Sequence, residues 1–395
     1  MRRRTLLGTV GSGVTLGVAG CLTQDGENGE GDPGSGDDSD DGEQTPVDDD
    51  GGDDAAESDD SDDSELSGTL EVVTYESMID GDNPAGPWIR EAFEEEYPDV
   101  DLEWTQLPDQ GINHYVNRAD EGVEIDPDVY FGLNIDDLVT VDDNLEDGGL
   151  FQELDTGRLE RADRIRDGLD MGDPHGRVLP YDTGYISLVY DESEVDEPET
   201  FEDLTEPAYE DALLAQNAQT SDPGQAFLLW TIDAFGEDGY LDYWADLRDN
   251  GVRVLDDWTE SYYGAYMEEE RPMVVSYSTD QVFAVAEGND LTRHQVGFLN
   301  DQGYANPEGM AIFENTENAD LAYAFFDFVL SNDAQAEIAE RNVQFPAVED
   351  EYVDLDDEFD EYAHVPPEAV TVGYDDLRGN VDEWVDDWAR EFAGH

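Results

Sequence analysis

Short apolar runs alternate with amphipathic stretches from Gly68 to the C-terminal end of the sequence. In some segments the apolar residues have the spacing that is typical of strands, and in others the spacing that is typical of helices. The first segments predict a strand, a helix, a strand, a helix and a strand at residues 69–75, 87–97, 100–104, 113–121 and 128–132. This β-α-β-α-β order indicates a mostly parallel sheet covered by helices.

The same alternation continues through the rest of the chain. Further strands are predicted at 177–181, 184–190 and 273–277, and further helices at 201–204, 225–235 and 381–392. The sequence has no repeat of fixed period, which argues against solenoids and propellers. We therefore expect an α/β fold of two lobes with a cleft between them.

The first 67 residues have a different pattern and are interpreted as an export signal and a spacer. Three arginines (Arg2 to Arg4) precede an uncharged, Gly-rich stretch that ends in Val18-Ala19-Gly20-Cys21, which predicts a twin-arginine lipoprotein signal over 1–21 with lipid attached to Cys21. Residues 22–67 are mostly Asp, Glu, Gly and Ser, with few apolar residues and no aromatic residue. This composition predicts a disordered acidic tether with a reach of roughly 40 Å.

Charge defines the environment for which the chain is suited. The 395 residues carry 104 acidic and 17 basic side chains, all of the latter arginine, for a formal charge of −87. Such a field repels phosphates, so we exclude nucleic acid as a partner. Screening in molar salt shortens the Debye length to about 3 Å, and the composition therefore indicates a halophilic protein. With 38% hydrophobic residues and 10% aromatic residues, the chain has enough apolar side chains for a core.

Motifs for catalysis and for cofactors are absent from the sequence. It contains no Gly-rich dinucleotide motif, no phosphate loop and no Gly-x-Ser-x-Gly elbow. The five histidines have no ligand spacing and there is a single cysteine, so we predict neither a metal site nor a cofactor. Acidic pairs are too common to identify an active site, and a secreted acidic hydrolase stays open as an alternative. The sequence favours a binding protein over an enzyme.

Aromatic and hydroxyl residues gather where the predicted strands end. Tyr75 closes the first strand, Tyr181 and Tyr185 flank Asp182-Thr183-Gly184, and Tyr277 follows the strand at 273–277. Ligands of open α/β sheets bind at the carboxyl ends of strands. Aromatic faces beside acidic groups suit a cationic, partly aromatic ligand, since cation–π contacts contribute about 0.5–2 kcal/mol per ring. Packing in the core or at a hinge is the alternative for each ring.

Nine segments, in order along residues 69–392, resemble the thiamine-binding solute receptors of ABC transporters, of a haloarchaeal lipoprotein type. These segments are 74–77, 128–134, 180–185, 188–191, 220–224, 228–230, 257–260, 275–279 and 384–388. The resemblance implies a type II periplasmic-binding-protein fold with two lobes and the ligand in the interlobe cleft. It places lobe 1 at about 68–180 plus 297–345, and lobe 2 at about 181–296 plus the C-terminal helices.

The resemblance also implies a set of binding residues. Four rings around the vitamin correspond to Tyr75, Trp258, Tyr277 and Phe283, an acidic contact of the aminopyrimidine corresponds to Asp109, and a hydroxyl turn for a phosphate corresponds to Thr220 and Ser221. Two family tryptophans are missing, at Asp82-Asn83-Pro84 and at Asn342-Val343.

The resemblance finally implies the function. We expect a monomeric, lipid-anchored receptor on the extracellular face of the cell membrane that delivers thiamine or its phosphates to an ABC permease with its ATPase. A polyamine receptor or a ferric-iron receptor of the same fold stays open as an alternative.

Overall fold

The computed structural model describes residues 66–80, 83–108, 110–145, 149–166 and 168–393. The predicted signal with Cys21, nearly all of the predicted tether and the predicted ligand residue Asp109 lie outside the described residues. Within the described part of the chain, no helix is long and apolar enough to cross a membrane.

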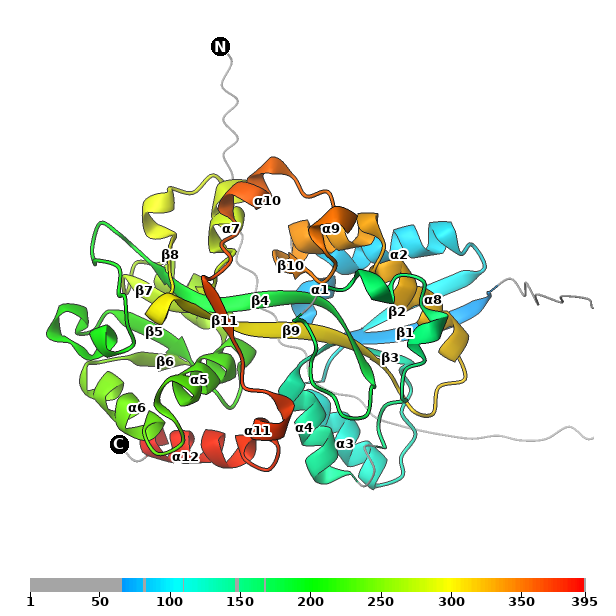
Figure 1. Ribbon diagram of the computed structural model, residues 1–395, viewed down its shortest axis with the longest axis horizontal. Coiled ribbons are helices and arrows are strands. Elements are labelled where there is room, and N and C mark those ends of the chain that lie inside the picture. Colours follow the sequence, from blue (N-terminus) through cyan, green and yellow to red (C-terminus); the bar gives the residue numbers. More distant parts are fainter. Residues whose placement is uncertain (1–65, 81–82, 109, 146–148, 167, 394–395) are drawn as a thin grey trace, which may run out of the picture. The chain divides into compact units, whose positions relative to one another are not determined.

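The first strands and helices follow the predicted β-α-β-α-β order (Figure 1). The elements are β1 (Gly68–Thr74), α1 (Glu76–Ile79), α2 (Ala85–Glu96), β2 (Val100–Gln106), α3 (Ile112–Asp120), β3 (Val129–Leu133) and α4 (Ile135–Asn144). β1 pairs in parallel with both β2 and β3. Leu70, Val72 and Val73 of β1 are fully buried, which is typical of a strand covered on both faces.

Two long antiparallel strands connect this part of the sheet to the rest. β4 (Val178–Tyr190) pairs with β9 (Gln302–Ile312) from Val178–Ala311 to Ile186–Tyr304. The sequence prediction of two separate strands here is wrong. Asp182-Thr183-Gly184 has the composition of a turn, but these residues continue β4 by pairing with β9, and two of them also pair with β10 (Phe345–Pro346).

The remaining strands lie beyond β4 in the sheet order β2-β1-β3-β9-β4-β7-β5-β6 (Figure 1). They and their helices are β5 (Leu213–Gln216), α5 (Asp222–Phe235), α6 (Tyr240–Asp249), β6 (Arg253–Leu255), β7 (Met273–Tyr277) and α7 (Asp280–Glu287). β8 (Gln295–Gly297) lies outside this order and pairs with β4. β5 pairs in parallel with β6 and β7. The short helix predicted at 201–204 is a 3₁₀ turn, Glu202–Thr205.

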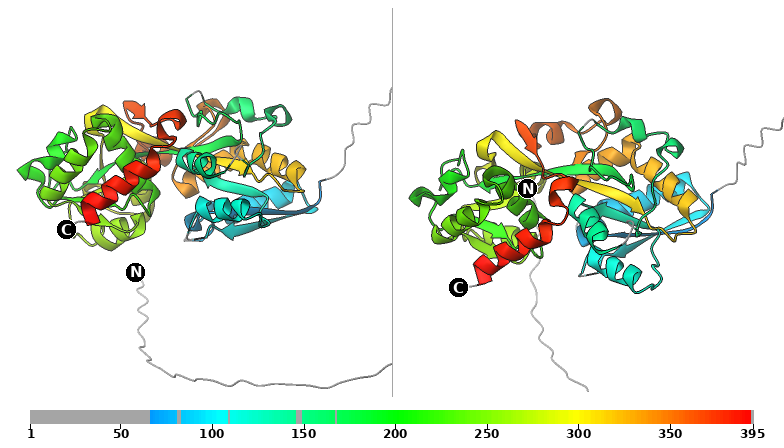
Figure 2. Two further views of the ribbon diagram at one scale, coloured as in Figure 1. Left: turned by 90° about the horizontal axis from the view of Figure 1, so that it is seen from below. Right: turned by 60° about the horizontal axis from the view of Figure 1, so that its bottom comes forward.

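The C-terminal third of the chain contributes elements to both parts of the sheet. Its helices and strands are α8 (Ala319–Val329), α9 (Asn332–Asn342), β10, α10 (Asp357–Tyr362), β11 (Glu368–Val370), α11 (Tyr374–Leu377) and α12 (Val381–Ala393). α12, predicted as an amphipathic helix with Trp residues, packs against α6 (Figure 2), with the rings of Trp244 and Trp388 5.4 Å apart. β11 pairs in parallel with β9.

A buried ionic network fixes the start of β4. Arg177, 2% exposed, donates to both carboxylate oxygens of Asp142 at 2.7 and 2.8 Å and to Asp173 at 2.8 Å. The Tyr374 hydroxyl also donates to Asp142. Burial alone would raise the pKa of Asp142, but the hydrogen bonds from Arg177 and Tyr374 lower it. The network therefore joins α4, β4 and α11 through an ionised carboxylate.

Candidate functional site

Two tyrosines at strand ends lie against glycines of neighbouring strands. Tyr75 follows β1, and a β-carbon added to Gly132 would lie 2.7 Å from its ring. Tyr277 ends β7, and a β-carbon at Gly184 would lie 2.9 Å from that ring. Both rings are half-buried. Only glycine allows this close approach of ring and backbone, so the two glycines define where the rings lie.

A β-bulge brings a second tyrosine and an aspartate to the same place. The β4–β9 register shifts between Pro180 and Asp182, so that Tyr181 is the extra residue and Asp182 lies opposite Glu308. Bulges commonly redirect a side chain next to a functional site. The Tyr181 hydroxyl donates to Glu308 Oε2 at 2.5 Å, and the Tyr75 hydroxyl donates to the same oxygen at 2.8 Å.

Asn342, the last residue of α9, completes this group of side chains. Its Nδ2 donates to the Tyr75 hydroxyl at 2.8 Å and to Asp182 Oδ2 at 3.1 Å. The next residue, Val343, adopts a left-handed conformation with φ 54° and ψ 45° and ends the helix, which is a rare conformation for a β-branched residue. We call Tyr75, Tyr181, Asp182, Glu308 and Asn342 the acid–tyrosine cluster.

The electrostatics of the acid–tyrosine cluster are those of acids without a counter-charge. Burial, followed by the charge of Glu308, raises the pKa of Asp182 well above its usual range. Burial also raises the pKa of Glu308 to about 7, and the nearby charge of Asp222 adds to this although the two tyrosine hydroxyls oppose it. Burial and the Glu308 charge raise the pKa of Tyr75 and of Tyr181, so both phenols remain hydrogen-bond donors at neutral pH.

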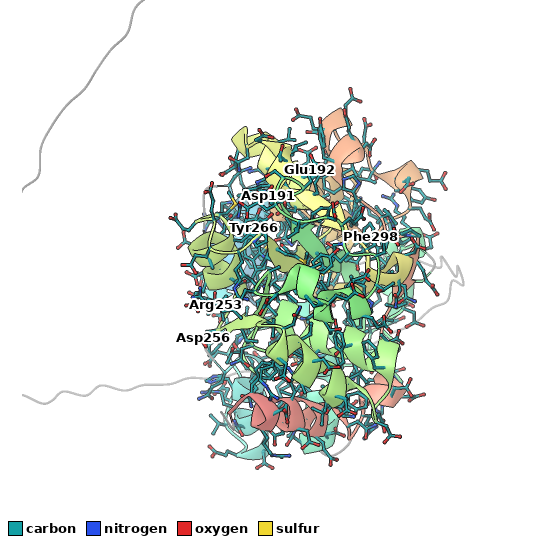
Figure 3. The ribbon with its side chains drawn as sticks, turned by 90° about the vertical axis from the view of Figure 1, so that its left-hand side faces the viewer. Asp191, Glu192, Arg253, Asp256, Tyr266 and Phe298 are labelled. Carbon is teal, nitrogen blue, oxygen red and sulfur yellow. The ribbon has the colours of Figure 1, made fainter. Side chains whose placement is uncertain are left out.

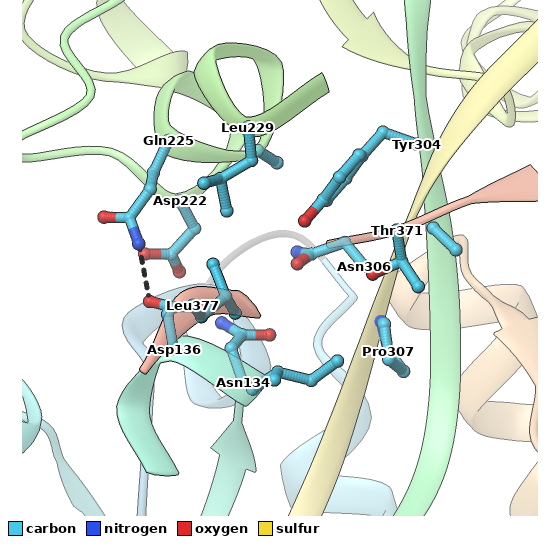
Figure 4. A pocket seen from close by; sticks show the side chains of 13 residues that line it. Asn134, Asp136, Asp222, Gln225, Leu229, Tyr304, Asn306, Pro307, Thr371 and Leu377 are labelled. Carbon is cyan, nitrogen blue, oxygen red and sulfur yellow. Dashed lines mark hydrogen bonds between the residues drawn. The ribbon is translucent and has the colours of Figure 1, made fainter. Parts of the chain in front are cut away.

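A second acidic group lies where α4 and α5 begin. Asp136 is in the first turn of α4 and Asp222 is in the first turn of α5. Gln225 of α5 donates to Asp136 Oδ2 at 2.9 Å and so joins the two helices (Figure 4). Burial and the charge of Asp222 raise the pKa of Asp136 to about 6. The pocket beside these residues is also lined by Tyr304 and Thr371.

Four aromatic side chains pack together near β7, and we call Trp258, Tyr262, Tyr263 and Phe283 the aromatic wall. Trp258 stacks on Tyr262 with ring centres 4.7 Å apart and an interplanar angle of 12°. Tyr263 meets Trp258 edge-on at 5.4 Å and Phe283 at 6.0 Å. The indole Nε1 of Trp258 donates to Ser276 Oγ at 3.1 Å, beside Tyr277. Trp258 and Phe283 are half-buried, so each side chain keeps some exposed surface although Trp258 stacks on Tyr262.

Buried polar contacts hold this wall from behind. The Tyr262 hydroxyl lies 3.4 Å from Nδ1 of His294, which lies 2.7 Å from Asp280 Oδ2. Tyr266 packs beneath Tyr262, and the guanidinium of Arg293 lies 4.6 Å from the Tyr266 ring centre. Arg293 also donates to Asp191 at 3.1 Å. These buried contacts therefore fix the position of Tyr262, on which Trp258 stacks.

The predicted hydroxyl turn precedes α5. Thr220 is exposed, and its hydroxyl donates to the Asp256 carbonyl at 2.7 Å, two residues before Trp258. Ser221 is buried, and its carbonyl accepts from the Gln225 backbone N–H at 2.9 Å. Both hydroxyl residues therefore lie between the aromatic wall and Asp222.

Comparison with known proteins identifies the family. A family model described as bacterial extracellular solute-binding protein matches residues 127–378. The chain belongs to this family. The thiamine-binding periplasmic protein of Escherichia coli strain K12 is 27% identical over 280 residues, which cover 70% of this chain and 80% of that protein. The Brucella suis biovar 1 protein of the same name is 27% identical over 288 residues, covering 72% and 80%.

Solved structures place this solute-binding protein among type II periplasmic binding proteins. A periplasmic thiamin binding protein is 26% identical with a TM-score of 0.69, covering 83% of this chain and 97% of that one. The ferric binding protein from Campylobacter jejuni shares the fold at 17% identity and a TM-score of 0.65, covering 82% and 99%. The predicted α/β fold of type II is thereby confirmed, as is the predicted resemblance to thiamine-binding receptors.

The solute-binding fold brings most of the predicted ligand residues into two neighbouring groups. Trp258 and Phe283 lie in the aromatic wall, with Thr220 and Ser221 next to it, whereas Tyr75 belongs to the acid–tyrosine cluster. Tyr277 connects the two groups: Ser276, the residue before it, accepts from Trp258, and its ring lies against Gly184, two residues after Asp182. The binding roles of these residues and the lobe boundaries stay predictions.

Several residues of the site are absent from the predicted set. They are Asp136, Tyr181, Asp182, Asp222, Gln225, Glu308 and Asn342. Asp182 could have been predicted from the sequence, because it lies between two tyrosines in a segment that resembles the receptor family. Glu308 could not have been predicted, because nothing in the sequence distinguishes it from the other acidic residues among the 104 in the chain.

Proposed function

We propose that this solute-binding protein captures thiamine outside the cell and delivers it to an ABC permease with its ATPase. The observation that carries the proposal is an aromatic wall near buried carboxylates, with Tyr277 connecting the two groups. The thiazolium ring is a cation that suits the half-buried faces of Trp258 and Phe283, and the aminopyrimidine offers N–H donors to carboxylates. Relatives that carry the name thiamine-binding periplasmic protein support the same ligand.

Unphosphorylated thiamine fits this site better than its phosphates. Thr220 and Ser221 stand at the start of α5, where a helix terminus attracts anions. In this chain, however, Asp222 occupies the first helical turn and lies close to Asp136. Because a phosphate placed here would meet two carboxylates, we propose that the hydroxyl turn binds the hydroxyethyl group of thiamine.

Tryptophan fluorescence in molar salt tests the proposal. Thiamine is expected to quench the emission of Trp258 and to raise the melting temperature, because the ligand binds only the folded state. W258F should lose the quenching but keep part of the affinity, since Phe retains a ring face. W88F is the matched control, because Trp88 lines a separate surface groove with Arg161 and Phe328. Neither quenching nor a thermal shift at millimolar thiamine would overturn the proposal.

A polyamine is the second candidate ligand. A linear polycation needs carboxylates at two separated ends, and the site has two acidic groups, Asp136 with Asp222 and Asp182 with Glu308. The aromatic wall favours thiamine, since a polyamine has no ring to stack. Calorimetry with spermidine at the same salt concentration separates the two ligands, and tighter binding of spermidine would reverse the order.

Ferric iron fits the described residues less well. The adjacent tyrosines Tyr262 and Tyr263 resemble a phenolate pair in sequence, but Tyr262 is fully buried and its hydroxyl lies beside His294. The two rings are also at 84° to each other. Within the described residues, no group of three His, Cys, Asp or Glu side chains could hold a metal ion. Calorimetry with Fe(III) is expected to show no specific binding.

We further propose that the protein is exported by the twin-arginine route and anchored through a lipid on Cys21. The basis is the Arg2-Arg3-Arg4 start and the Val18-Ala19-Gly20-Cys21 sequence. C21S is expected to release the protein into the medium, and replacement of Arg2–Arg4 by lysines should retain it in the cytoplasm. C21S protein that stays with the membrane would contradict the anchor.

A further inference from the structure

Two carboxylates face each other on the two long strands of the sheet. Asp182 of β4 and Glu308 of β9 are direct register partners. Opposite residues of an antiparallel pair project from the same face, and like charges in that position repel each other. Asp182 is fully buried and Glu308 is half-buried. Of the two carboxylates, only that of Glu308 is therefore in contact with solvent.

The groups around this pair do not neutralise it. Glu308 accepts from Tyr75 and Tyr181, and Asp182 Oδ2 accepts from Asn342. The remaining influences are Tyr277 at the end of β7 and the acidic Asp222 at the start of α5, whose charge reaches Glu308. Among the described residues, no hydrogen bond or ion pair joins an arginine to either carboxylate. The surroundings offer neutral donors and one further negative charge.

One acceptor of the pair lacks a donor. Oδ1 of Asp182 is fully buried and has no hydrogen-bond partner in the structure. A buried unsatisfied acceptor costs about 1–3 kcal/mol, and more when the group is charged. The arrangement thus needs either a proton on the pair or an N–H donor supplied by a ligand, and the positive charge of a cationic ligand favours loss of the proton.

We propose that Asp182 and Glu308 share one proton in the empty protein and release it to solvent when a cationic ligand binds beside them, which makes the pair the charge-selecting element of the site. The inference rests on the proposed function for the existence of a cationic ligand. An opposite charge within about 4–6 Å of a carboxyl lowers its pKa by about 1–3 units, which is enough to ionise Glu308 near neutral pH.

Calorimetry of thiamine binding in two buffers of different ionisation enthalpy counts the released protons. At about pH 6.5, the wild-type protein is expected to release about one proton more than E308Q when thiamine binds. At pH values below the pKa of the pair, the affinity of the wild type for thiamine should increase as the pH rises, by up to about tenfold per pH unit. E317Q, which removes an exposed carboxylate, is the matched control and should behave like the wild type. D182N should lose at least about tenfold in affinity, because the ligand's N–H then meets a neutral amide oxygen in place of a charged carboxylate acceptor.

Each outcome decides between the two proposals. Equal proton release by the wild type and E308Q, with thiamine bound by both, overturns the shared proton and leaves the proposed function standing. If thiamine does not bind, the proposed function fails, and the pair is tested in the empty protein by infrared spectroscopy at neutral pH. A protonated-carboxyl band that disappears in both D182N and E308Q, but stays in E317Q, supports the shared proton. A band that stays unchanged in D182N or in E308Q overturns it.

Discussion

Asp222 occupies the first turn of α5, directly after the hydroxyl residues Thr220 and Ser221. A helix N-terminus favours negative charge through its exposed N–H groups and the aligned peptide dipoles. Here the chain itself supplies that charge, and Asp136 lies close enough for the two carboxylates to affect each other. At the scale of single residues, the proposed preference of the site for a cation thus rests on where individual carboxylates lie.

D222N is expected to change the selectivity between thiamine and thiamine monophosphate. Removing the carboxylate leaves the helix terminus free for a phosphate, so affinity for the monophosphate should rise by about tenfold, in line with a charge interaction of about 1–2 kcal/mol. Affinity for thiamine itself should fall or stay constant. Calorimetry with both ligands checks this, and E317Q serves as the control. A loss of monophosphate affinity in D222N would show that Asp222 does not oppose the phosphate.

The β4–β9 pair is the element on which the acid–tyrosine cluster depends. Its bulge places Tyr181 and Asp182 next to Glu308, and the start of β4 is fixed by Arg177 with Asp142 and Asp173. Arg177 directly precedes β4 and lies a few residues before the bulge at Tyr181, so we expect the ionic network to support the site by holding this end of the strand.

R177M is expected to destabilise the protein by about 3–5 kcal/mol, because it leaves two buried carboxylates without their cation. Denaturant unfolding in molar salt measures this change. R253M is the matched control: Arg253 pairs with Glu270 at the surface, both side chains being more than 40% exposed, and such a pair contributes about 0–1 kcal/mol. Similar losses in the two variants would contradict a supporting role for the buried network.

Over the whole molecule, carboxylates outnumber cations far beyond the predicted tether. From Gly68 onward the sequence has 84 acidic residues against 14 arginines, a formal charge of −70. Figure 3 shows many carboxylate oxygens projecting outward from one face. Self-repulsion of this size destabilises a folded state, and screening by salt reduces it. The site adds buried acids whose pKa values are raised, so stability also depends on pH.

Stability is expected to fall as the pH rises from about 5 to about 8. The folded state raises the pKa of Glu308 to about 7 and that of Asp136 to about 6, so the folded state binds more protons than the unfolded state across this interval. Stability therefore decreases with pH there, by up to about 3 kcal/mol for Glu308 at ~1.4 kcal/mol per pKa unit. Denaturation midpoints at both pH values test this. E308Q should lose less stability than the wild type, and an unchanged pH dependence in E308Q would contradict the assignment.

Much of the fold could be predicted from the sequence because its signals are local. Apolar periodicity identified β1, α2, β2, β3 and α12 within a few residues, since the pattern of each segment reflects the faces it buries. The strand break predicted at Asp182-Thr183-Gly184 failed because polar residues with glycine are typical of a turn, whereas the pairing partners that make them a strand come from β9 and β10.

For the site, the sequence by itself determined the chemical type of the proposed ligand residues: aromatic rings, hydroxyls and acids at strand ends in the order of a receptor family. Only the tertiary structure decided which acids matter. Asp182 and Glu308 are 126 residues apart in the chain, and their charges interact because the strand register and a bulge set them opposite each other. Coulombic coupling depends on distance in space and on burial, and neither can be read from the order of the residues.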